Sequence, residues 1–228
     1  MEVQVKFGLC NRLQTIIGFF TYNNSEELKI VWKEDNECPG NFEDYFEKIP
    51  DVSFLKEKTE NCVGDFFEFP YKEYALKEEE YLNKFKENHK IVVPNADIRR
   101  YIETLKLDEM IGIHIRRTDF LPHIRKYYHD IIPEIDNLYF INLIKSIVEK
   151  NPKQKIFLAT DNRQTQEMFF HLYPKNIIFL KIIDENNDKR KTDLKDAIID
   201  LFCLISCKEF YGTKESSFSK FVENYRNK

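Results

Sequence analysis

The sequence lacks the features that would place the chain outside the cell, in a membrane or on a nucleic acid. Its five cysteines include no Cys-x-x-C pair, and their odd number and scatter indicate a reducing compartment. No stretch approaches the ~20 apolar residues that a membrane-spanning helix needs, and the first residues do not resemble a signal peptide. The net charge of −4 argues against a general nucleic-acid binder. We therefore expect a cytoplasmic protein whose anion site, if it has one, is a local cluster of positive charge.

Metal-binding patterns are also missing from the sequence. There is no Asp-x-Asp motif and no other recognisable cluster of metal ligands, so we expect no metal cofactor. What is present is the composition of a folded protein: 228 residues, 42% hydrophobic and 32% charged. This length suffices for two compact domains. Cys203 and Cys207 lie four residues apart in an apolar run, which predicts two buried thiols on a helix.

Strand-like and helix-like segments alternate along the chain, which predicts an α/β fold with parallel sheets covered by helices. The expected strands are Val3 to Phe7, Leu28 to Trp32, Val52 to Leu55, Met110 to Ile115, Lys155 to Thr160, Asn176 to Leu180 and Glu209 to Tyr211. The expected helices are Cys10 to Tyr22, Leu76 to Asn88, Asp97 to Leu105, a helix starting at Pro133, Gln164 to Leu172, Asp196 to Cys207 and Phe218 to Tyr225. The polar run Asp184 to Lys191 is expected to be a solvated loop. We expect two small Rossmann-like lobes, residues 1–95 and 96–228, with a cleft between them.

The most distinctive segment is His114-Ile-Arg116-Arg117-Thr-Asp119, which directly follows an apolar strand. Ligands of parallel sheets bind beyond the carboxyl ends of the strands, where Arg116 and Arg117 are expected to lie. A guanidinium group is always charged and matches phosphate oxygens with a planar fork of donors. The two arginines are therefore candidate diphosphate ligands, although ion pairs with surface carboxylates are a second interpretation. His114 is either part of the site or a hydrogen-bonded core histidine.

Three other strand ends carry polar residues. Gly8, Asn11 and Arg12 form the first strand-to-helix turn, where free backbone N–H groups and polar side chains can meet a ligand. Asp161 follows a strand and either accepts hydrogen bonds from a guanine base or caps the next helix. Ser216 and Ser217 open the last helix, as phosphate ligands or as its N-cap.

Together and in this order, these segments resemble the fucosyltransferase superfamily that includes the nodulation, α-1,6 and protein O-fucosyltransferases. The HxRRxD-like segment of that superfamily corresponds to His114 to Asp119, and the GLxNRL turn of its nodulation-type relatives corresponds to Gly8 to Leu13. The later A-T-D, D-x-x-x-D-L and S-S-F segments correspond to Ala159 to Asp161, Asp196 to Leu201 and Ser216 to Phe218.

The resemblance implies a GT-B fold, with an acceptor-side lobe at residues 1–95 and a nucleotide-sugar-binding lobe at residues 96–228. It implies an inverting transferase that moves fucose from GDP-fucose to a glycan or other hydroxyl acceptor. Arg116 would contact the diphosphate, Arg117 and His114 would support the nucleotide, Asp161 would recognise guanine, and Ser216 and Ser217 would lie near the phosphates. Where the α-1,6 enzymes carry a lysine and a glutamate after this motif, Phe120 and Ile124 stand here.

The departure from the motif leaves the general base open among Asp119, His123 and Asp44. His123 titrates near neutrality when unperturbed, which suits proton transfer, although an exposed loop histidine is a second interpretation. Two fixed arginines and a helix N-terminus can replace the metal ion that other transferases use. Three rival functions stay open: a transferase that uses another nucleotide sugar, a catalytically silent GDP-sugar-binding protein, and a plain nucleotide-binding domain. The sequence does not indicate an oligomeric state.

Overall fold

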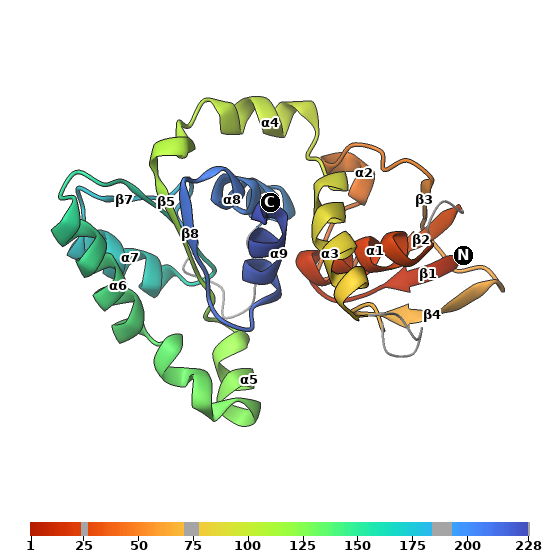
Figure 1. The fold of residues 1–228 in the computed structure, drawn as a ribbon, viewed down its shortest axis with the longest axis horizontal. Helices are drawn as coiled ribbons and strands as arrows, with labels where there is room; N and C mark the ends of the chain where they lie inside the picture. Colours follow the sequence, from red (N-terminus) through yellow and green to blue (C-terminus); the bar gives the residue numbers. More distant parts are fainter. Residues whose placement is uncertain (24–26, 71–77, 184–192, 228) are drawn as a thin grey trace. The chain divides into compact units, whose positions relative to one another are not determined.

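The computed structural model describes residues 1–23, 27–70, 78–183 and 193–227 and divides the chain into two compact units (Figure 1). The first unit is Met1–Arg99 together with Glu223–Lys228, and the second is Arg100–Val222. Each unit contains one four-stranded sheet whose described strand pairs are all parallel. The predicted α/β class with two parallel sheets is confirmed.

The first unit builds its sheet in the order β3-β2-β1-β4. The strands are β1 (Glu2–Val5), β2 (Leu28–Trp32), β3 (Val52–Leu55) and β4 (Cys62–Phe66). The helices are α1 (Leu9–Asn23), α2 (Phe42–Tyr45), α3 (Glu78–Asn88), the 3-10 helix His89–Ile91 and α4 (Ala96–Glu103), which runs across the boundary between the units. Helix α1 packs on the sheet because Leu13, Ile16 and Ile17 recur at helical spacing and are all fully buried.

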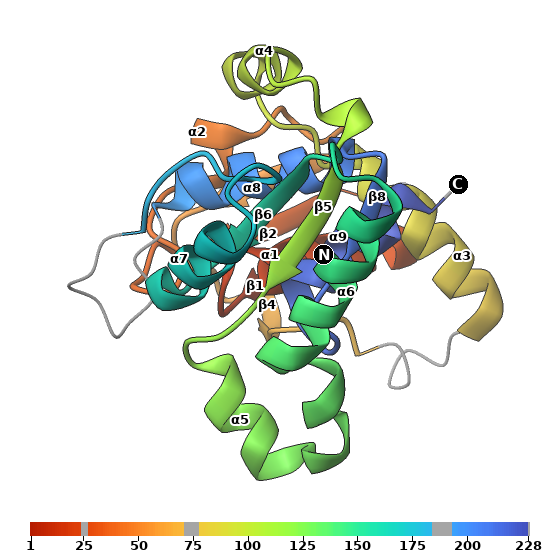
Figure 2. The same cartoon turned by 90° about the vertical axis from the view of Figure 1, so that its left-hand side faces the viewer.

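The second unit builds its sheet in the order β7-β6-β5-β8. The strands are β5 (Ile111–Ile115), β6 (Ile156–Thr160), β7 (Ile177–Ile178) and β8 (Glu209–Tyr211). The helices are α5 (Phe120–Tyr127), α6 (Asn137–Lys150), α7 (Arg163–Leu172), α8 (Leu194–Ser206) and α9 (Ser217–Arg226), with 3-10 helices at Leu107–Glu109 and His129–Glu134. Helices α6 and α7 cover one face of this sheet, and α8 and α9 cover the other (Figures 1 and 2).

The core of the second unit lies between β5, β6 and helices α6 and α7. Every residue of β5 and β6 is buried, as expected for central strands with helices on both faces. Ile113, Leu158, Phe140 and Phe169 bring the two strands and the two helices into one apolar cluster. On the opposite face Cys203 and Cys207 are buried, which confirms the prediction for these two thiols. This core holds the carboxyl ends of β5 and β6 in fixed positions.

Both sheets have the same strand order when the strands are numbered within each unit: third, second, first, fourth. In such a sheet the second and third strands lie on one side of the first strand, and the fourth strand lies on its other side. The position where the direction changes is called the switch point, and ligands bind there, beyond the carboxyl ends of the strands. The switch point lies between β1 and β4 in the first unit and between β5 and β8 in the second. The residues that directly follow these four strands are the best placed to meet a ligand.

Some elements differ from the prediction. Strand β4 was not expected, because its exposed positions and Gly64 interrupt the apolar pattern of a buried strand. Helix α5 was also missed, because Pro122 looks like a helix breaker although it is tolerated in a first helical turn. The predicted strand Asn176 to Leu180 is reduced to β7.

Helix α6 starts later than predicted. Pro133 lies in the preceding 3-10 helix, and the side chain of Asp136 caps α6 by accepting from the backbone N–H of Tyr139 at 2.7 Å. The predicted loop Asp184 to Lys191, and the first two residues of the helix predicted at Leu76 to Asn88, lie outside the described residues. Within the described part of the chain, no helix combines the length and the apolar character that a bilayer crossing requires.

Candidate functional site

Arg116 lies directly after β5, beside the loop that follows β8. Its backbone N–H donates to the hydroxyl of Thr213 at 2.9 Å, and that hydroxyl donates to the carbonyl of His114 at 2.9 Å. The guanidinium pairs with Asp161 at 2.6 Å and with Asp119 at 2.5 Å. The side chain of Asp161 is 8% exposed, whereas that of Asp119 is 59% exposed. The ion pair of Arg116 with Asp161 is therefore shielded from solvent, whereas its ion pair with Asp119 is open to solvent and weaker.

Asp161 organises the loop after β5. One of its carboxylate oxygens accepts from the backbone N–H of Arg117 at 2.7 Å, and the other accepts from the hydroxyl of Thr118 and from Arg116. The alternative role of Asp161 as a helix cap is wrong, because the N-cap of α7 is Asn162, whose side chain accepts from Thr165 N–H at 2.8 Å. The expected contact of Asp161 with guanine would have to replace one of its bonds within the loop.

Arg117 is buried and bonded within the second unit. Its guanidinium donates to the side-chain oxygen of Asn137 at 2.8 and 3.2 Å and to the carbonyl oxygens of Ile135 and Arg116 at 2.9 Å. It also lies over the ring of Phe140, 5.6 Å from the centroid. Burial lowers the pKa of Arg117 to about 10, so the group stays charged at neutral pH. Arg117 therefore fixes the loop after β5 and has no surface ion pair among its described contacts.

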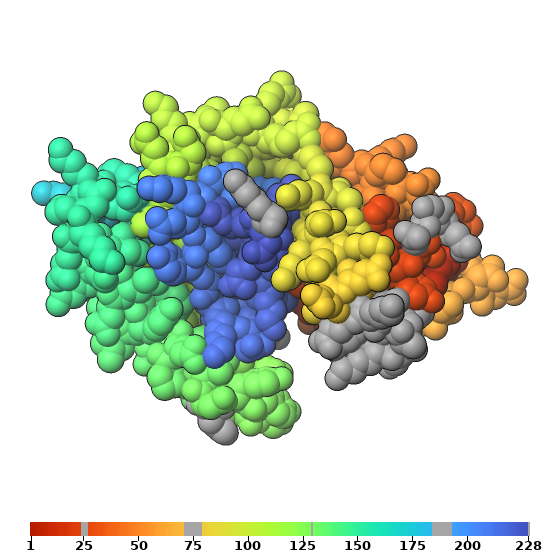
Figure 3. All heavy atoms as spheres, in the orientation of Figure 1, coloured from red at the N-terminus to blue at the C-terminus, as the bar shows by residue number. Residues whose placement is uncertain are grey.

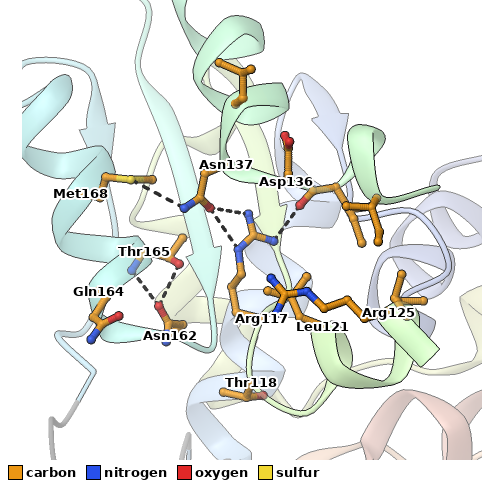
Figure 4. Close-up of a pocket in the computed structure, with 14 residues that line it drawn as sticks. Arg117, Thr118, Leu121, Arg125, Asp136, Asn137, Asn162, Gln164, Thr165 and Met168 are labelled. Atoms are coloured by element: carbon orange, nitrogen blue, oxygen red, sulfur yellow. Dashed lines mark hydrogen bonds between the residues drawn. The ribbon is translucent and has the colours of Figure 1, made fainter. Parts of the chain in front are cut away.

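A cavity of about 700 Å³ opens beside Arg117, at the carboxyl ends of β5 and β6 (Figure 4). Helices α5, α6 and α7 and the 3-10 helix His129–Glu134 contribute its walls. Apolar side chains such as Leu121 and Met168 alternate there with polar ones such as Asn162, Gln164 and Arg125. A cavity with this mixed lining suits an organic ligand that carries polar groups. Arg116 and Asp161 are not among the lining residues.

His114 is a structural member of the site. Its Nδ1 lies 2.8 Å from the hydroxyl of Ser219, its ring stacks on Phe218 at 4.5 Å, and burial with the nearby charges of Arg116 and Arg117 lowers its pKa to about 3. The interpretation of His114 as a hydrogen-bonded core histidine is confirmed. The imidazole is neutral at physiological pH, so it cannot act there as a cation toward phosphate.

Sequence reasoning missed Thr213 and Ser219, which connect β5 to the start of α9. The hydroxyl of Ser219 accepts from the backbone N–H of Thr213 at 2.9 Å, and both side chains are buried. Gly212 makes this approach possible, because a Cβ built there would lie 2.6 Å from the Ser219 side chain. From this segment the sequence predicted only Ser216 and Ser217, as phosphate ligands or as the N-cap, and only Gly212 indicated close packing.

Ser217 is the first residue of α9 and Ser216 directly precedes it, so both lie at the start of the last helix, as the sequence indicated. Ser216 is buried, its N–H donates to the carbonyl of Thr213 at 3.2 Å, and Ser217 is partly exposed. Glu215 precedes them with a positive φ of 62°. Backbone N–H groups at the start of this ten-residue helix are candidate phosphate donors at the switch point of the second unit.

The first strand-to-helix turn corrects one prediction. Arg12 is fully buried, and its guanidinium donates to the carbonyl oxygens of Phe7 at 2.7 Å and Lys33 at 2.6 Å and pairs with Asp35 at 2.5 Å. Its guanidinium carbon also lies 5.1 Å from the centroid of the Trp32 ring. Arg12 therefore stabilises the turn and is not available to a ligand.

The other two predicted residues of this turn serve the backbone of α1. Gly8 is buried, and its carbonyl accepts from the N–H groups of Asn11 and Arg12, while the carbonyl of Asn11 accepts from the Thr15 hydroxyl. The left-handed residue of the turn is Phe7, with a φ of 65°. That conformation costs a residue with a Cβ roughly 1–2 kcal/mol.

The candidate bases lie in different places. Asp119 contacts Arg116, as described above. His123 is an exposed residue of α5, with ring contacts to Tyr127 at 4.9 Å and Tyr128 at 5.9 Å, and it does not line the cavity. Helix α5 lies at the surface of the second unit (Figure 3, green). In the first unit, Asp44 accepts from Asn41 and so belongs to the cap of α2.

Asp200 lies in the middle of α8, and the sequence pointed to it only as part of the segment Asp196 to Leu201. It is partly buried, and burial with the nearby charge of Asp196 raises its pKa to about 7. Carboxyl groups with such shifts are concentrated at functional sites. Among the described residues, no three His, Cys, Asp or Glu side chains are grouped so that they could hold a metal ion.

These features define an α/β protein with two Rossmann-like units, each with a topological switch point in its parallel sheet, and this is the GT-B-like fold. No protein-family model matches the sequence, and no curated protein matches it. Solved structures match the fold over nearly the whole chain.

The similar structures include those of NodZ alpha-1,6-fucosyltransferase and of POFUT1. NodZ alpha-1,6-fucosyltransferase co-crystallized with GDP matches with a TM-score of 0.61 and 15% identity, over 97% of this chain and 91% of that chain. NodZ from Bradyrhizobium gives the same values. POFUT1 in complex with GDP-fucose matches with a TM-score of 0.66 and 13% identity, over 99% of this chain and 94% of that chain. The fold of this chain is therefore fucosyltransferase-like.

Proposed function

We propose that this protein is an inverting glycosyltransferase that transfers fucose from GDP-fucose to a hydroxyl group of a glycan acceptor. Two observations support this proposal. The fold resembles that of proteins solved with GDP or GDP-fucose, and Arg116 lies at the switch point of the second sheet, where such a ligand is expected to bind. The position of Arg116 is the observation on which the proposal mainly depends.

Arg116 is the proposed ligand of the donor diphosphate. Asp161, which is nearly buried, holds one guanidinium nitrogen in place, while the other nitrogen pairs with the exposed carboxylate of Asp119. An exposed ion pair contributes little, about 0–1 kcal/mol, so a diphosphate can displace Asp119 at small cost. The backbone N–H groups near Ser216 and Ser217 are proposed as additional phosphate donors.

The remaining predicted residues act around this centre. Arg117 and His114 position the loop and strand that carry Arg116, and Asp161 anchors the guanidinium. In the proposed reaction the acceptor oxygen attacks the anomeric carbon from the face opposite the diphosphate. The bond from that carbon to the phosphate oxygen breaks, and its electron pair leaves with GDP. A base takes the acceptor proton, and Asp119 and His123 are the candidates in the second unit.

The proposal includes catalysis without a metal ion. A fixed guanidinium group stabilises negative charge that develops on the leaving diphosphate, because it is already oriented before the reaction starts. The activity is then expected to survive treatment with EDTA and to show no dependence on added magnesium or manganese. Loss of activity in EDTA that magnesium or manganese restores would contradict this part of the proposal.

The test is GDP release from GDP-fucose, with and without glycan acceptors, by wild-type protein and the variant Arg116→Ala. We expect the variant to lose ~10²–10³ in rate while it keeps its fold, because removal of one group that stabilises the leaving charge typically has this effect. Lys145→Ala is the matched control, because Lys145 forms an exposed ion pair with Glu149 on α6 of the same unit. Equal activity of Arg116→Ala and wild type would refute the assignment.

The rival functions predict different binding results. A transferase for another nucleotide sugar is stabilised against heat more by UDP or dTDP than by GDP. A catalytically silent protein binds GDP-fucose but releases no GDP from it. A plain nucleotide-binding domain binds GMP about as tightly as GDP, because it gains nothing from the second phosphate. GDP binding tighter than GMP binding, with GDP release, supports the proposal against all three.

A further inference from the structure

Phe7 has an unusual combination of backbone conformation and side-chain position. Among the described residues, those other than glycine with a positive φ are Phe7, Asp51, Lys106 and Glu215, and Phe7 alone of these has a large apolar side chain. Bulky residues in this conformation are rare and occur where the surrounding structure enforces it. Phe7 is nevertheless 47% exposed as a residue, so core packing does not explain the conformation.

The enforcing contact comes from Arg12. Its Nε donates to the carbonyl of Phe7 at 2.7 Å, and the rest of the guanidinium is tied to Lys33, Asp35 and Trp32. The fully buried arginine thus fixes the backbone at Phe7 and the direction in which its ring leaves the turn. Such an arrangement preorganises a side chain that the core of the unit does not use.

The second ring belongs to Phe67, which directly follows β4. It is 49% exposed, and its centroid lies 5.4 Å from that of Phe7, with the two ring planes inclined at 53°. Strands β1 and β4 are neighbours, and a backbone hydrogen bond from Lys6 N–H to the Phe66 carbonyl joins their ends. The switch point of the first sheet lies between these two strands. The exposed pair therefore occupies the position in this unit where a ligand is expected.

We propose that Phe7 and Phe67 form a stacking platform for one sugar ring of the acceptor, an inference that rests on the proposed function. One face of a pyranose ring presents C–H groups, which are apolar and weakly positive, and these complement the negative face of an aromatic ring. The platform binds the acceptor by its sugar face and requires no charged group on it. The donor diphosphate instead requires the fixed charge of Arg116.

The size and surroundings of the pair favour a saccharide over other occupants. Two half-exposed phenylalanine rings offer roughly 100 Å² each, far less than the ~800 Å² that each partner of a stable protein interface buries. Asp65 of β4 pairs with Lys6, which directly follows β1, and with Lys58, which lies between β3 and β4. Lys6 is the neighbour of Phe7 in the sequence, and Asp65 precedes Phe67 by two residues, so partly exposed charges accompany both rings. Such polar neighbours suit a hydroxylated ligand better than a lipid chain.

The test uses the whole 228-residue chain, with lactose, cellobiose and N-acetyllactosamine as probes at millimolar concentration. The aromatic ring signals of phenylalanine are followed by NMR and assigned with the variants Phe7→Gly and Phe67→Leu. We expect at least one disaccharide to shift the signals of both rings. Each variant should weaken its binding by about 2- to 12-fold, the range that aromatic stacking energies imply. Binding of GDP should be unchanged.

Phe7→Gly also separates binding from stability. Glycine adopts the left-handed conformation without strain, so this variant should unfold at a temperature no lower than wild type while it binds the disaccharide more weakly. Phe170→Leu is the control, since Phe170 is an exposed ring on α7 that contacts Phe179. It should leave disaccharide binding unchanged.

Two outcomes would overturn the platform. In the first, the probes do not shift the signals of Phe7 and Phe67 in a protein that binds GDP. In the second, Phe170→Leu weakens disaccharide binding as much as Phe7→Gly does. Failure of wild-type protein to bind GDP would instead contradict the proposed function, so the two failures are distinguishable.

Discussion

Replacement of Asp119 by asparagine tests whether this carboxylate competes with the donor for Arg116. The Asp119 carboxylate lies 2.5 Å from the guanidinium of Arg116, at the nitrogen that Asp161 does not occupy. If the diphosphate takes this position, the ion pair must break when GDP binds. Asp119→Asn removes the competing charge and keeps a side-chain oxygen beside the hydroxyl of Thr118, which lies 3.0 Å from Asp119 and donates its proton to Asp161.

The size of the effect follows from the exposure of the pair. Asp119 is 59% exposed, and exposed ion pairs contribute about 0.2–1 kcal/mol. We therefore expect Asp119→Asn to bind GDP about 1.4- to 5-fold more tightly than wild type, since 1.4 kcal/mol corresponds to about a factor of ten. The gain should shrink in high salt, because salt screens charges that are accessible to solvent.

Isothermal titration of GDP at two ionic strengths measures this gain. Glu149→Gln is the control, because Glu149 carries an equally exposed carboxylate that pairs with Lys145 on α6. Weaker GDP binding by Asp119→Asn, or an unchanged affinity at low salt, would refute the competition. Turnover then decides the second role of Asp119. A loss of ~10²–10⁴ in kcat identifies it as the general base. An unchanged kcat leaves His123 and Asp44 as the candidates, to be tested by His123→Gln and Asp44→Asn.

Two further predictions concern the stability of the site. Ser219→Ala should lower the free energy of unfolding by about 1–3 kcal/mol in chemical denaturation, because the buried N–H of Thr213 and Nδ1 of His114 lose their hydrogen-bond partner. Ser206→Ala is the control, because it removes a hydroxyl hydrogen bond within α8. An equal effect of both variants would contradict this role of Ser219. Burial lowers the pKa of His114 to about 3 from its ordinary 6.5, so the folded protein binds a proton at His114 only at a lower pH than the unfolded chain does. The contribution of neutral His114 to the free energy of unfolding is therefore complete above pH 6.5 and is lost as the pH falls toward 3. His114→Gln should reduce the slope of stability against pH in this window by at most about 1.4 kcal/mol per pH unit, and an unchanged slope would show that His114 is not buried as described.

The sequence predicted the alternation of strands and helices well, because this information is local. The strands β2, β3 and β8 have their predicted bounds, since β-branched and aromatic residues and the flanking turns determine them. Strand β4 and helix α5 escaped prediction because tertiary pairing and a tolerated proline outweigh the local pattern.

The location of the site was predictable because ligands of parallel sheets bind beyond the carboxyl ends of the strands. Arg116 could be placed after β5 from the apolar run alone, and the structure confirms that location. The choice between a ligand and a structural arginine was not predictable, because it depends on partners far away in sequence. Arg12 became structural through Lys33 and Asp35, and Arg117 through Asn137, all at least twenty residues away along the chain.

The two units have the same strand order but different side chains at the end of the first strand. Each sheet has its switch point beside its first strand. In each unit a buried polar group holds a residue in the loop that follows this strand. In the second unit Asp161 holds the cation Arg116, and in the first unit Arg12 holds the aromatic ring of Phe7 through its backbone. An anionic diphosphate requires a charge that is oriented before it arrives, whereas a neutral sugar ring requires an exposed apolar surface of fixed direction. The difference between these two side chains, at equivalent positions of the two sheets, is the physical reason for our proposal that the donor binds to the second unit and the acceptor to the first.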